Sequence, residues 1–534
     1  MIDIEFDISA GWRPDLTSSQ IYENKALADA KNIESYNGSY WPVMGIGQLG
    51  TPASGVSGQG YPTNGVRIRD TSNNYYMVVG SKALSGEGKG SLTLIAATQA
   101  FNATNTASGY SASGYIGLDW DFEQYGNWVI ATNYSEPPQI LKGLTGTEKF
   151  ADMGNLPAGF KAKYVLFNNG HLVFAGYYTT ADQEVIRGII WSAQENIDGT
   201  DAYTPDEVTG AGNENFPELD GAITGIVPLR NGYVVYAERG LVLAQYTAGI
   251  GTFDFIRNPY PGIGCYYPKS LISIGDVNLF WSDTTIYAYD GSSKPVDVGK
   301  GVMKLVISEL QVGYESEIAS AHDIAKSSVY WLYPSGYNYT LGKTSKKILV
   351  YNYAENKFSY IQTPDPELIR SIFTGIDQTE ATVDSMTNSV DSMTQYVDSS
   401  SWSTRTELPA IILDEQYLDT GGWEIGFFKD GGSLLTSTIR TGGNTLSRDV
   451  YMVGGVRTGI NSISIDSATE NTAYIGIRMS EVEDYTRSNA YTIKTNGFVD
   501  TRNTGRQFYL EYSINYFTKL GNKLTAEVAI TGRK

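Results

Sequence analysis

The chain has few of the side chains that chemical sites need. Cys265 is its single cysteine, so no disulfide can form within the chain and no thiolate cluster can hold a metal. His171 and His322 are its only histidines, so any Ser-His-Asp triad would need one of them, and neither lies in a G-x-S-x-G context. We expect both histidines to be structural and Cys265 to be a buried, unreactive thiol. We therefore predict that the protein is not an enzyme and binds neither a metal ion nor a cofactor.

Long apolar runs and helix-forming stretches are also scarce. No apolar run is long enough to span a membrane as a helix. The chain begins MIDIEFDISAGWRP, in which no basic segment precedes an apolar one. Neither a membrane-spanning segment nor Sec export is expected. Helices are predicted only at residues 23–33 and 301–310.

Basic side chains are outnumbered by acidic ones. The chain has 39 Lys and Arg against 58 Asp and Glu, which gives a net charge of −19. This is the wrong sign for a protein that grips the phosphate backbone of DNA. An acidic surface remains compatible with DNA that only slides past it.

Glycine and tyrosine are abundant instead. The 534 residues include 58 Gly and 39 Tyr, a mixture that suits many strands joined by tight turns. A chain of this length is also expected to form two or more domains. We therefore predict an all-β fold.

Paired apolar strands recur every few tens of residues through the first two thirds of the chain. Several pairs share one form, in which an apolar strand, a Gly or Asn turn and a second, aromatic-rich strand follow one another, as in SLISIGDVNLFWSDTTIYAYDG. Diverged blades of a β-propeller have this spacing. We predict a β-propeller, with a multi-sheet sandwich as the alternative.

The composition and hydrophobic pattern of the sequence change at three places and divide the chain into four parts. Residues 66–366 carry the paired strands of the predicted propeller, and residues 367–407 form a polar linker or loop that includes TVDSMTNSVDSMTQYVDSSS. Strands return over residues 408–534, which we predict to be a β-sandwich-like platform domain. Residues 1–65 are an N-terminal segment that belongs either to this platform or to the propeller.

Two short motifs resemble ligand sites only superficially. GEGKGS at residues 86–91 lacks the Gly-Lys-Ser/Thr junction of a phosphate loop and is predicted to be a hairpin turn. DWDFEQYG at residues 119–126 places acids at alternate positions, but Gln124 stands where a calcium loop needs glycine. We predict a strand with a solvated acidic face. A pair of carboxylates suited to glycan cleavage is not excluded by the sequence.

Several segments, in order, resemble the tail nozzle proteins of short-tailed bacteriophages, the podovirus group of tail tubular protein B and related packaged-DNA stabilisation proteins. The matching segments are ENKALADAKNIESYNGSYWPVMG, FEQYGNWVIATNYSEPPQIL, GIIWSAQENID, GIGCYYPKSLISIGDVNLFWSDTTIYAYDG, VDSMTNSVDSM, WEIGFFKDGGSL, FVDTRNTGRQFYLEYSI and ITGRK. The residues that carry the resemblance are Ala30, Asn32, Gly45, Trp191, Ser192, Gly264, Ser270, Trp281, Ser282, Asp290, Gly291, Gly505, Arg506, Gly532 and Arg533. Turn and core residues of this kind indicate a shared fold more than a shared site.

The resemblance implies a structural virion protein. Such a subunit assembles in the bacterial host cytoplasm into a homo-oligomeric, hexameric ring below the portal and adaptor, beside tail fibre or spike proteins. The ring closes and then conducts the DNA ejection channel, through which DNA passes without specific binding. The sequence assigns no residues to the channel lining, because the two faces of a strand are distinguishable only once its register is known.

Two other functions remain open. A carbohydrate-binding β-propeller or tail adhesin is the second hypothesis, since the many Trp and Tyr side chains can stack on sugars. A glycan-cleaving propeller is the third, and it requires two carboxylates that face one cleft.

Overall fold

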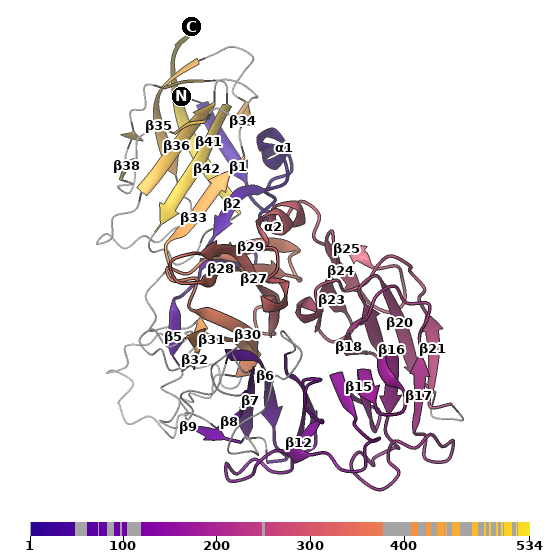
Figure 1. Ribbon diagram of the computed structural model, residues 1–534. Helices are drawn as coiled ribbons and strands as arrows, with labels where there is room; N and C mark the ends of the chain where they lie inside the picture. Colours follow the sequence, from indigo (N-terminus) through magenta and orange to yellow (C-terminus); the bar gives the residue numbers. More distant parts are fainter. Residues whose placement is uncertain are drawn as a thin grey trace.

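The computed structural model describes most of the chain. Described residues are 2–48, 61–82, 90–103 and 119–376, apart from 73, 97–98 and 248–250, and beyond these mainly the strands between residues 407 and 533. The predicted polar linker at 377–406 and most of GEGKGS lie outside them. Within this part of the chain the fold is almost entirely β, as predicted (Figure 1).

Strands of the described residues form a β-propeller of seven four-stranded blades, which confirms the predicted fold class. The blades, each from its innermost strand outward, are: β6 (Tyr61–Arg69), β7 (Tyr75–Lys82), β8 (Leu92–Ala96), β9 (Gln99–Asn102); β10 (Asp121–Tyr125), β11 (Trp128–Thr132), β12 (Gln139–Leu141), β13 (Ala151–Asp152); β14 (Lys161–Asn168), β15 (His171–Thr179), β16 (Gln183–Trp191), β17 (Gly212–Asn215); β18 (Ile223–Leu229), β19 (Gly232–Ala237), β20 (Gly240–Tyr246), β21 (Phe253–Arg257); β22 (Ile272–Ser273), β23 (Asn278–Trp281), β24 (Ile286–Tyr289), β25 (Val296–Asp297); β26 (Ala319–Asp323), β27 (Ser328–Asn338), β28 (Lys343–Asn352), β29 (Lys357–Ile361); and β30 (Ile369–Ile376), β31 (Glu407–Asp414), β32 (Trp423–Phe428), β5 (Ile46–Gln48).

The seventh blade closes the ring with strands from distant parts of the sequence. Strand β5, near the N-terminus, is its outermost strand and pairs antiparallel with β32. The inner strands then contact one another in cyclic order, β6, β10, β14, β18, β22, β26, β30 and back to β6. Hydrogen bonds between the two ends of the propeller therefore hold the ring shut.

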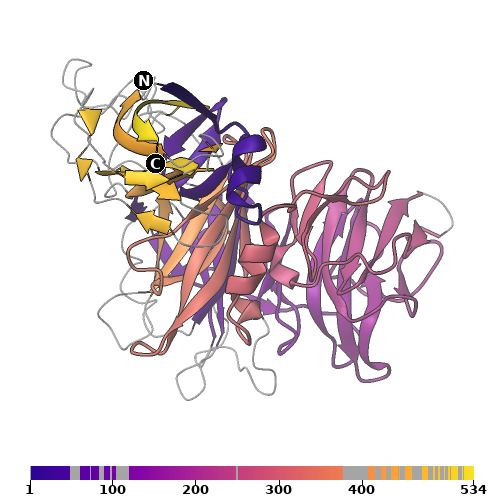
Figure 2. The same cartoon turned by 90° about the horizontal axis from the view of Figure 1, so that it is seen from above.

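Strands from both ends of the chain build the platform. One sheet contains β1 (Ile2–Asp7), β42 (Lys523–Arg533), β35 (Tyr451–Gly459), β39 (Phe498–Val499) and β40 (Asn503–Gly505). The second contains β2 (Leu27–Lys31), β33 (Ser437–Thr441), β34 (Asn444–Thr445), β41 (Gln507–Ile514), β36 (Thr472–Arg478), β37 (Tyr485–Arg487) and β38 (Tyr491–Thr492). The platform stands on the side of the propeller that holds β27 to β29, away from blades three and four (Figure 1 and Figure 2).

The strand pairing places the domain boundaries differently from the sequence analysis. Strands β30 to β32 belong to the propeller, although 66–366 was its predicted range, and β6 begins at Tyr61. The N-terminal segment is shared, since β1 and β2 pair with platform strands while β5 pairs with the propeller. Pairing between distant strands decides these boundaries, and local composition does not record it.

One helix prediction is confirmed and the other is wrong. Helix α2 (Met303–Glu309) lies where residues 301–310 predicted one. Residues 23–33 instead form the end of α1 (Ser18–Glu23), strand β2 and the start of β3 (Ile33–Tyr36). Strand β33 provides β2 with a hydrogen-bonding partner that a local sequence pattern cannot reveal. Both described α-helices are too short to cross a membrane.

Propeller and platform share one hydrophobic core. Phe6 of β1 and Ile8, just after it, pack with Leu27 and Ala30 of β2 and with Ile439 of β33, so the two platform sheets face one another. The same buried cluster continues into the propeller. Its propeller members include Trp281, Trp331, Tyr333, Leu349, Tyr351 and Phe358. A core of this kind resists separation of the two domains, because separation would expose large aromatic surfaces.

Candidate functional site

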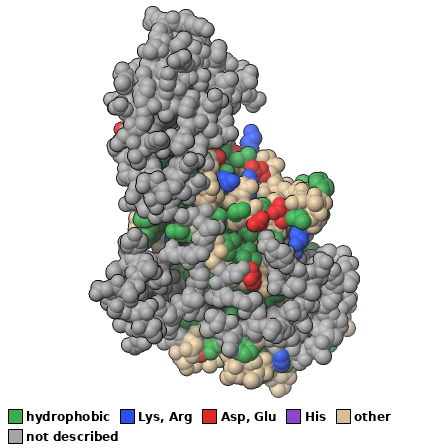
Figure 3. Space-filling view, turned by 90° about the vertical axis from the view of Figure 1, so that its left-hand side faces the viewer, with side chains coloured by type: hydrophobic (Ala, Val, Ile, Leu, Met, Phe, Trp, Pro, Cys, Tyr) green, Lys and Arg blue, Asp and Glu red, His purple; other side chains and the backbone are tan. Residues whose placement is uncertain are grey.

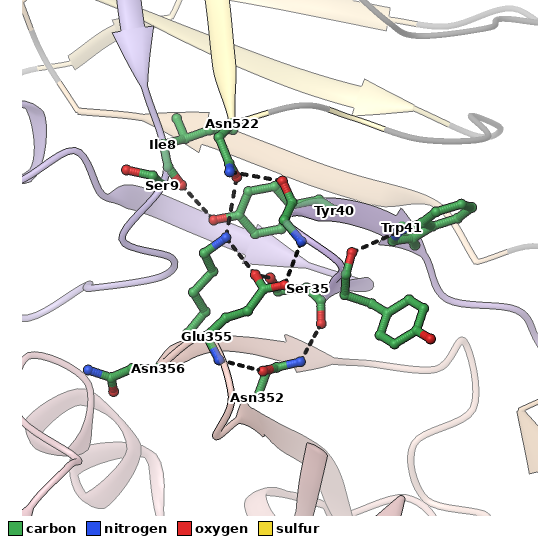
Figure 4. A network of polar contacts seen from close by, with 12 residues as sticks. Ile8, Ser9, Ser35, Tyr40, Trp41, Asn352, Glu355, Asn356 and Asn522 are labelled. Carbon is green, nitrogen blue, oxygen red and sulfur yellow. Dashed lines mark hydrogen bonds and ion pairs between the residues drawn. The ribbon is translucent and has the colours of Figure 1, made fainter. Parts of the chain in front are cut away.

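A short hairpin is wedged between the propeller and the platform (Figure 4). Its strands are β3 and β4 (Ser39–Pro42), which pair antiparallel from Ile33 opposite Pro42 to Tyr36 opposite Ser39. Asn37 and Gly38 form the turn, both with positive φ (50° and 69°), as a two-residue type I′ turn requires. We call the hairpin and the groups that hold it the joint.

Blade six holds one side of the hairpin through Glu34. The Glu34 carboxylate is 4% exposed, and it accepts hydrogen bonds from Lys326 Nζ at 2.5 Å and from the Tyr330 hydroxyl at 2.9 Å. Burial and the neighbouring Glu34 carboxylate raise the pKa of Tyr330. Lys326 and Tyr330 come from the turn and strand that follow β26, so Glu34 ties the hairpin to the first turn of the blade.

The third turn of blade six, between β28 and β29, holds the tip of the hairpin. Glu355 accepts hydrogen bonds from the Ser35 hydroxyl at 2.5 Å and from the Gly38 amide at 2.6 Å, and Asn352 Nδ2 donates to the Ser35 carbonyl at 2.8 Å. Burial opposes ionisation of Glu355, but Lys357 at 2.8 Å and the Ser35 hydroxyl outweigh it and lower the pKa of Glu355. Glu355 is therefore a charged acceptor that fixes the turn.

The platform holds the other side of the hairpin through Tyr40. Its main chain pairs with Leu520 in both directions at 2.8 Å, and its hydroxyl donates to the Ile8 carbonyl at 2.5 Å. Asn522 Nδ2 donates to the Gly38 carbonyl at 2.9 Å. Tyr40 is fully buried, and burial raises its pKa, so the hydroxyl stays protonated as a donor.

Asn32, which precedes the hairpin, connects three elements. Its side chain donates to the Thr436 carbonyl at 2.9 Å and accepts from the Gln362 amide at 2.8 Å. Its main-chain amide donates to the Tyr360 carbonyl at 2.7 Å. Asn32 is 2% exposed and has φ of 55°, a left-handed conformation that asparagine tolerates better than most residues. It thus links the sheet of blade six to the platform.

Three of the residues that carry the family resemblance lie in blade five or just before it. The Ser270 hydroxyl donates to the Tyr267 carbonyl at 2.7 Å and accepts from the Trp281 amide at 2.9 Å. Trp331 Nε1 donates to the Ser270 carbonyl at 2.8 Å, which links blade five to blade six. Gly264 lies against the main chain of Ala237 to Gly240, where a side chain would have no room. All three have structural roles.

The remaining resemblance residues are spread over the fold. Trp191 and Ser192 are buried at the end of β16, Asp290 and Gly291 form the turn after β24, and Gly45 is buried before β5. Gly505 lies in β40, and Gly532 and Arg533 lie in β42, while Arg506 falls outside the described residues. Ala30 pairs with Ile439 across the platform sheet. Ser282 accepts hydrogen bonds from Thr284 and Thr285 in a tight turn.

The two histidines and the cysteine are held by structural contacts. His171 Nδ1 lies 2.7 Å from the Ser192 carbonyl, and His322 Nε2 lies 3.1 Å from the Tyr353 hydroxyl. Burial lowers the pKa of His322 to about 4 and raises the pKa of Cys265 to about 12. Cys265 therefore stays a thiol at neutral pH. Among the described residues, no group of three or more His, Cys, Asp or Glu side chains is placed to hold a metal ion.

Two of the three acids of DWDFEQYG, Asp121 and Glu123, lie in the innermost strand of the second blade, and Asp119 precedes it. The predicted strand is confirmed as β10, but the prediction that its acids are solvated is wrong. Asp121 Oδ2 accepts the Val165 amide of β14 at 2.9 Å. The innermost strand of a blade has one edge without a strand partner. The Asp121 carboxylate accepts from one of the main-chain amides on that edge of β14. Burial raises the pKa of Asp121 and of Glu123 to about 7.

Asp121→Asn is expected to make stability less dependent on pH. A carboxyl group whose folded pKa is raised stabilises the fold most below its unfolded pKa, and this contribution is lost as pH rises through about 7. At pH 8 the asparagine, which keeps an acceptor for Val165, should therefore be more stable than wild type by about 1 to 2 kcal/mol. Thermal unfolding at pH 5 and pH 8 measures this. An equal Tm difference at both values would contradict it.

A cavity of about 390 Å³ is lined by residues of α1, β2 and β33 on one side and of α2, β28 and β29 on the other. It is lined by Trp12, Pro14, Leu16, Ile21, Leu305 and Thr441, among others, and by the charged side chains Asp29, Glu309, Lys347 and Arg440. Glu309 pairs with Lys347 at 2.9 Å, and Asp29 accepts from the Tyr360 hydroxyl at 2.9 Å. Two acids and two bases leave the lining without a net charge, so it selects no ligand by charge.

Sequence reasoning missed most residues of the joint. Asn32 was selected through the family resemblance, but Glu34, Tyr40, Lys326 and Glu355 were not. The Asn-Gly pair in SYNGSY was the available signal, since it marks a tight hairpin. The partners of the hairpin lie some 300 to 500 residues away in the sequence, with separations of 292, 317 and 484 for the Lys326, Glu355 and Asn522 contacts.

The fold defines a seven-bladed β-propeller protein with a β-sandwich platform. The chain matches no protein-family model and no curated protein sequence. It is similar to the solved structure of Raptor from Chaetomium thermophilum (TM-score 0.38, 9% identity), covering 73% of this chain but only 29% of Raptor. It is also similar to the WD40 domain of Pan2 from Neurospora crassa (TM-score 0.37, 10% identity, 73% of this chain and 98% of that one). A third similar structure is the Cps50 (Swd1) β-propeller domain of Myceliophteria thermophila (TM-score 0.36, 9% identity). The match covers 69% of this chain and 97% of that domain.

Proposed function

We propose that this chain is a structural subunit of a short-tailed bacteriophage tail, a nozzle protein that acts without catalysis. In this proposal six copies form a ring below the portal and adaptor, in contact with tail fibre or spike proteins. The ring closes and then conducts the ejection channel of the virion, and DNA passes without specific binding. Assembly takes place in the bacterial cytoplasm.

The observation that carries this proposal is the position of the resemblance residues in the fold. Asn32 links blade six to the platform, and Ser270 and Trp281 lie in or beside the core that both domains share. Part of the resemblance therefore lies where the propeller is attached to the platform, and Asn32 makes direct contacts on both sides of that attachment. A subunit that bears internal pressure benefits from such a fixed attachment, because flexing between domains would open a ring.

Charge is the second support. The net charge of −19 disfavours lasting contact with a polyanion. On the described part of the face in Figure 3, Lys and Arg side chains stand apart from one another, with Asp and Glu among them. A surface of this kind lets DNA slide past, whereas neutralised phosphates would hold it.

The purified protein is expected to form a ring of six copies, alone or with the adaptor protein of its own phage. Its mass would then be six times the 58.4 kDa of one chain, measured by native mass spectrometry, and averaged electron images would show a six-fold annulus. A protein that stays monomeric or trimeric in the presence of the adaptor would contradict the proposal. Such a result, together with glycan binding, would favour the alternative of a carbohydrate-binding propeller or tail adhesin.

A further inference from the structure

The outer tip of blade six exposes an unusual group of aromatic and aliphatic side chains. Strands β27 and β28 form a long hairpin, and at its tip Tyr339 is 88% exposed and Leu341 55% exposed. Val312, on the segment that runs beside the hairpin, is 82% exposed. We call Val312, Tyr314, Tyr337, Tyr339 and Leu341 the tyrosine tip. Exposed apolar groups that cluster in this way mark binding surfaces.

The three tyrosine rings form a connected series. Tyr337 lies between the other two, with ring centroids 5.5 Å from Tyr314 and 5.1 Å from Tyr339. The planes are inclined by 39° and 69°, so neighbouring rings present their faces in different directions. Tyrosine has only two side-chain torsions, and rings that pack on one another lose little further freedom when a ligand binds.

The turn that carries Tyr339 is fixed by its own hydrogen bonds. Asn338 Oδ1 accepts from the Thr340 amide at 3.1 Å and from the Leu341 amide at 3.2 Å. Asn338 Nδ2 donates to Glu367 Oε1 at 3.0 Å, which anchors the turn to the segment before β30. The exposed ring of Tyr339 is therefore presented on an ordered support.

Two carboxylates lie on the segments that carry or anchor the rings. Glu367 uses one oxygen for Asn338, and Glu315 uses one for the Gly313 amide at 3.0 Å, so both carboxylates keep acceptor capacity for hydroxyl groups. These segments thus carry carboxylates and tyrosine hydroxyls as well as apolar ring faces. A sugar has the complementary form, since its C–H groups make an apolar face and its hydroxyls surround that face.

The small size and the acidic charge of the tyrosine tip favour a neutral sugar over a protein partner or an anionic ligand. Five side chains are far fewer than the 20 to 30 residues a side, about 800 Å², that a stable protein interface uses. The carboxylates of Glu315 and Glu367, in a chain of net charge −19, repel phosphate and sulfate groups. We propose that the tyrosine tip binds a neutral polysaccharide, with the ring of Tyr339 stacked on a sugar face and Glu315 and Glu367 as acceptors for its hydroxyls.

The test uses the full-length protein with maltoheptaose, cellohexaose, a neutral galactan and a neutral bacterial O-polysaccharide as probes, and dextran sulfate as the anionic control. Isothermal titration calorimetry should detect binding of at least one neutral glycan and no binding of dextran sulfate. Tyr339→Ala should weaken that binding about tenfold or more, as truncation of a central aromatic contact does. Tyr339→Trp, which keeps a larger ring face, should retain it.

Tyr36→Ala is the matched control, because Tyr36 is 36% exposed and belongs to the hairpin that Glu355 holds after β28, at the opposite end of β28 from Tyr339. It should leave glycan binding unchanged. Failure of every neutral probe to bind at millimolar concentration overturns the proposal, and so does equal binding by Tyr339→Ala. A lower oligomer mass for Tyr339→Ala also overturns it and assigns the tip to a protein interface. The ring itself is measured separately, so failure of glycan binding leaves the nozzle proposal intact.

Discussion

Replacing Glu34 with alanine is expected to lower the free energy of opening of the joint by about 3 kcal/mol. The change leaves the Tyr330 hydroxyl, on a side chain that is 1% exposed, without its acceptor. Lys326 is 38% exposed and can turn toward water or Asp323, so the loss should stay below that of a fully buried ion pair. Native-state hydrogen exchange at the Tyr40 amide, which pairs with Leu520, measures the opening.

Two variants separate the parts of this effect. Glu34→Gln keeps an acceptor for Tyr330 and loses only the charge, so a smaller loss of about 1 kcal/mol is expected. Lys523→Ala removes an ion pair with Glu5 whose side chains are 63% and 53% exposed, and it should change stability by less than about 0.5 kcal/mol. If the Tyr40 amide exchanged at the same rate in Glu34→Ala as in the wild type, the contacts with the platform alone would fix the hairpin.

The propeller could be predicted from the sequence because each blade repeats a local signal. In NLFWSDTTIYAYDG, two apolar strands flank a polar turn, and the structure pairs β23 with β24 from Asn278 opposite Tyr289 to Trp281 opposite Ile286. Adjacent antiparallel strands need only a turn and matching alternation, both of which the sequence records. The same reasoning holds for the other blades whose strands are consecutive in the chain.

Closure of the ring could not be predicted in this way. Strand β5 completes blade seven from a position more than 300 residues before β30, and β2 joins the platform sheet although its residues also suited a helix. Long-range pairing depends on edges that become available only after the blades have formed. Composition therefore assigned β30 to β32 to a linker and a second domain, while their hydrogen bonds place them in the propeller.

The joint could be predicted only in part. Asn32 was selected, but the sequence did not show that its side chain reaches Gln362 and Thr436, which are 330 and 404 residues away. Glu34 is one of 58 acidic residues, and nothing near it in the sequence sets it apart. Glu34 acquires its structural role because the fold buries it against Lys326 and Tyr330, and the sequence does not record that burial.

Asn32→Ala is expected to destabilise the attachment of the platform by about 3 to 5 kcal/mol, the larger of the two joint effects. Alanine removes the acceptor of the Gln362 amide and the donor to the Thr436 carbonyl, at a position that is 2% exposed. Alanine also tolerates φ of 55° less well than asparagine, whose short polar side chain favours this left-handed conformation. Differential scanning calorimetry should show one unfolding transition in the wild type and two in Asn32→Ala.

Asn32→Gly measures how much of this loss comes from the backbone. Glycine adopts positive φ without strain but makes neither side-chain hydrogen bond, so it should be more stable than Asn32→Ala by about 1 kcal/mol and less stable than wild type. Asn37→Gly, in the exposed turn of the hairpin, is the matched control, since it changes asparagine to glycine at φ of 50° where neither buried partner is lost. If Asn32→Gly matched the wild type, the two side-chain bonds would contribute nothing, and the shared aromatic core around Trp281 and Trp331 would be what holds the platform on the propeller.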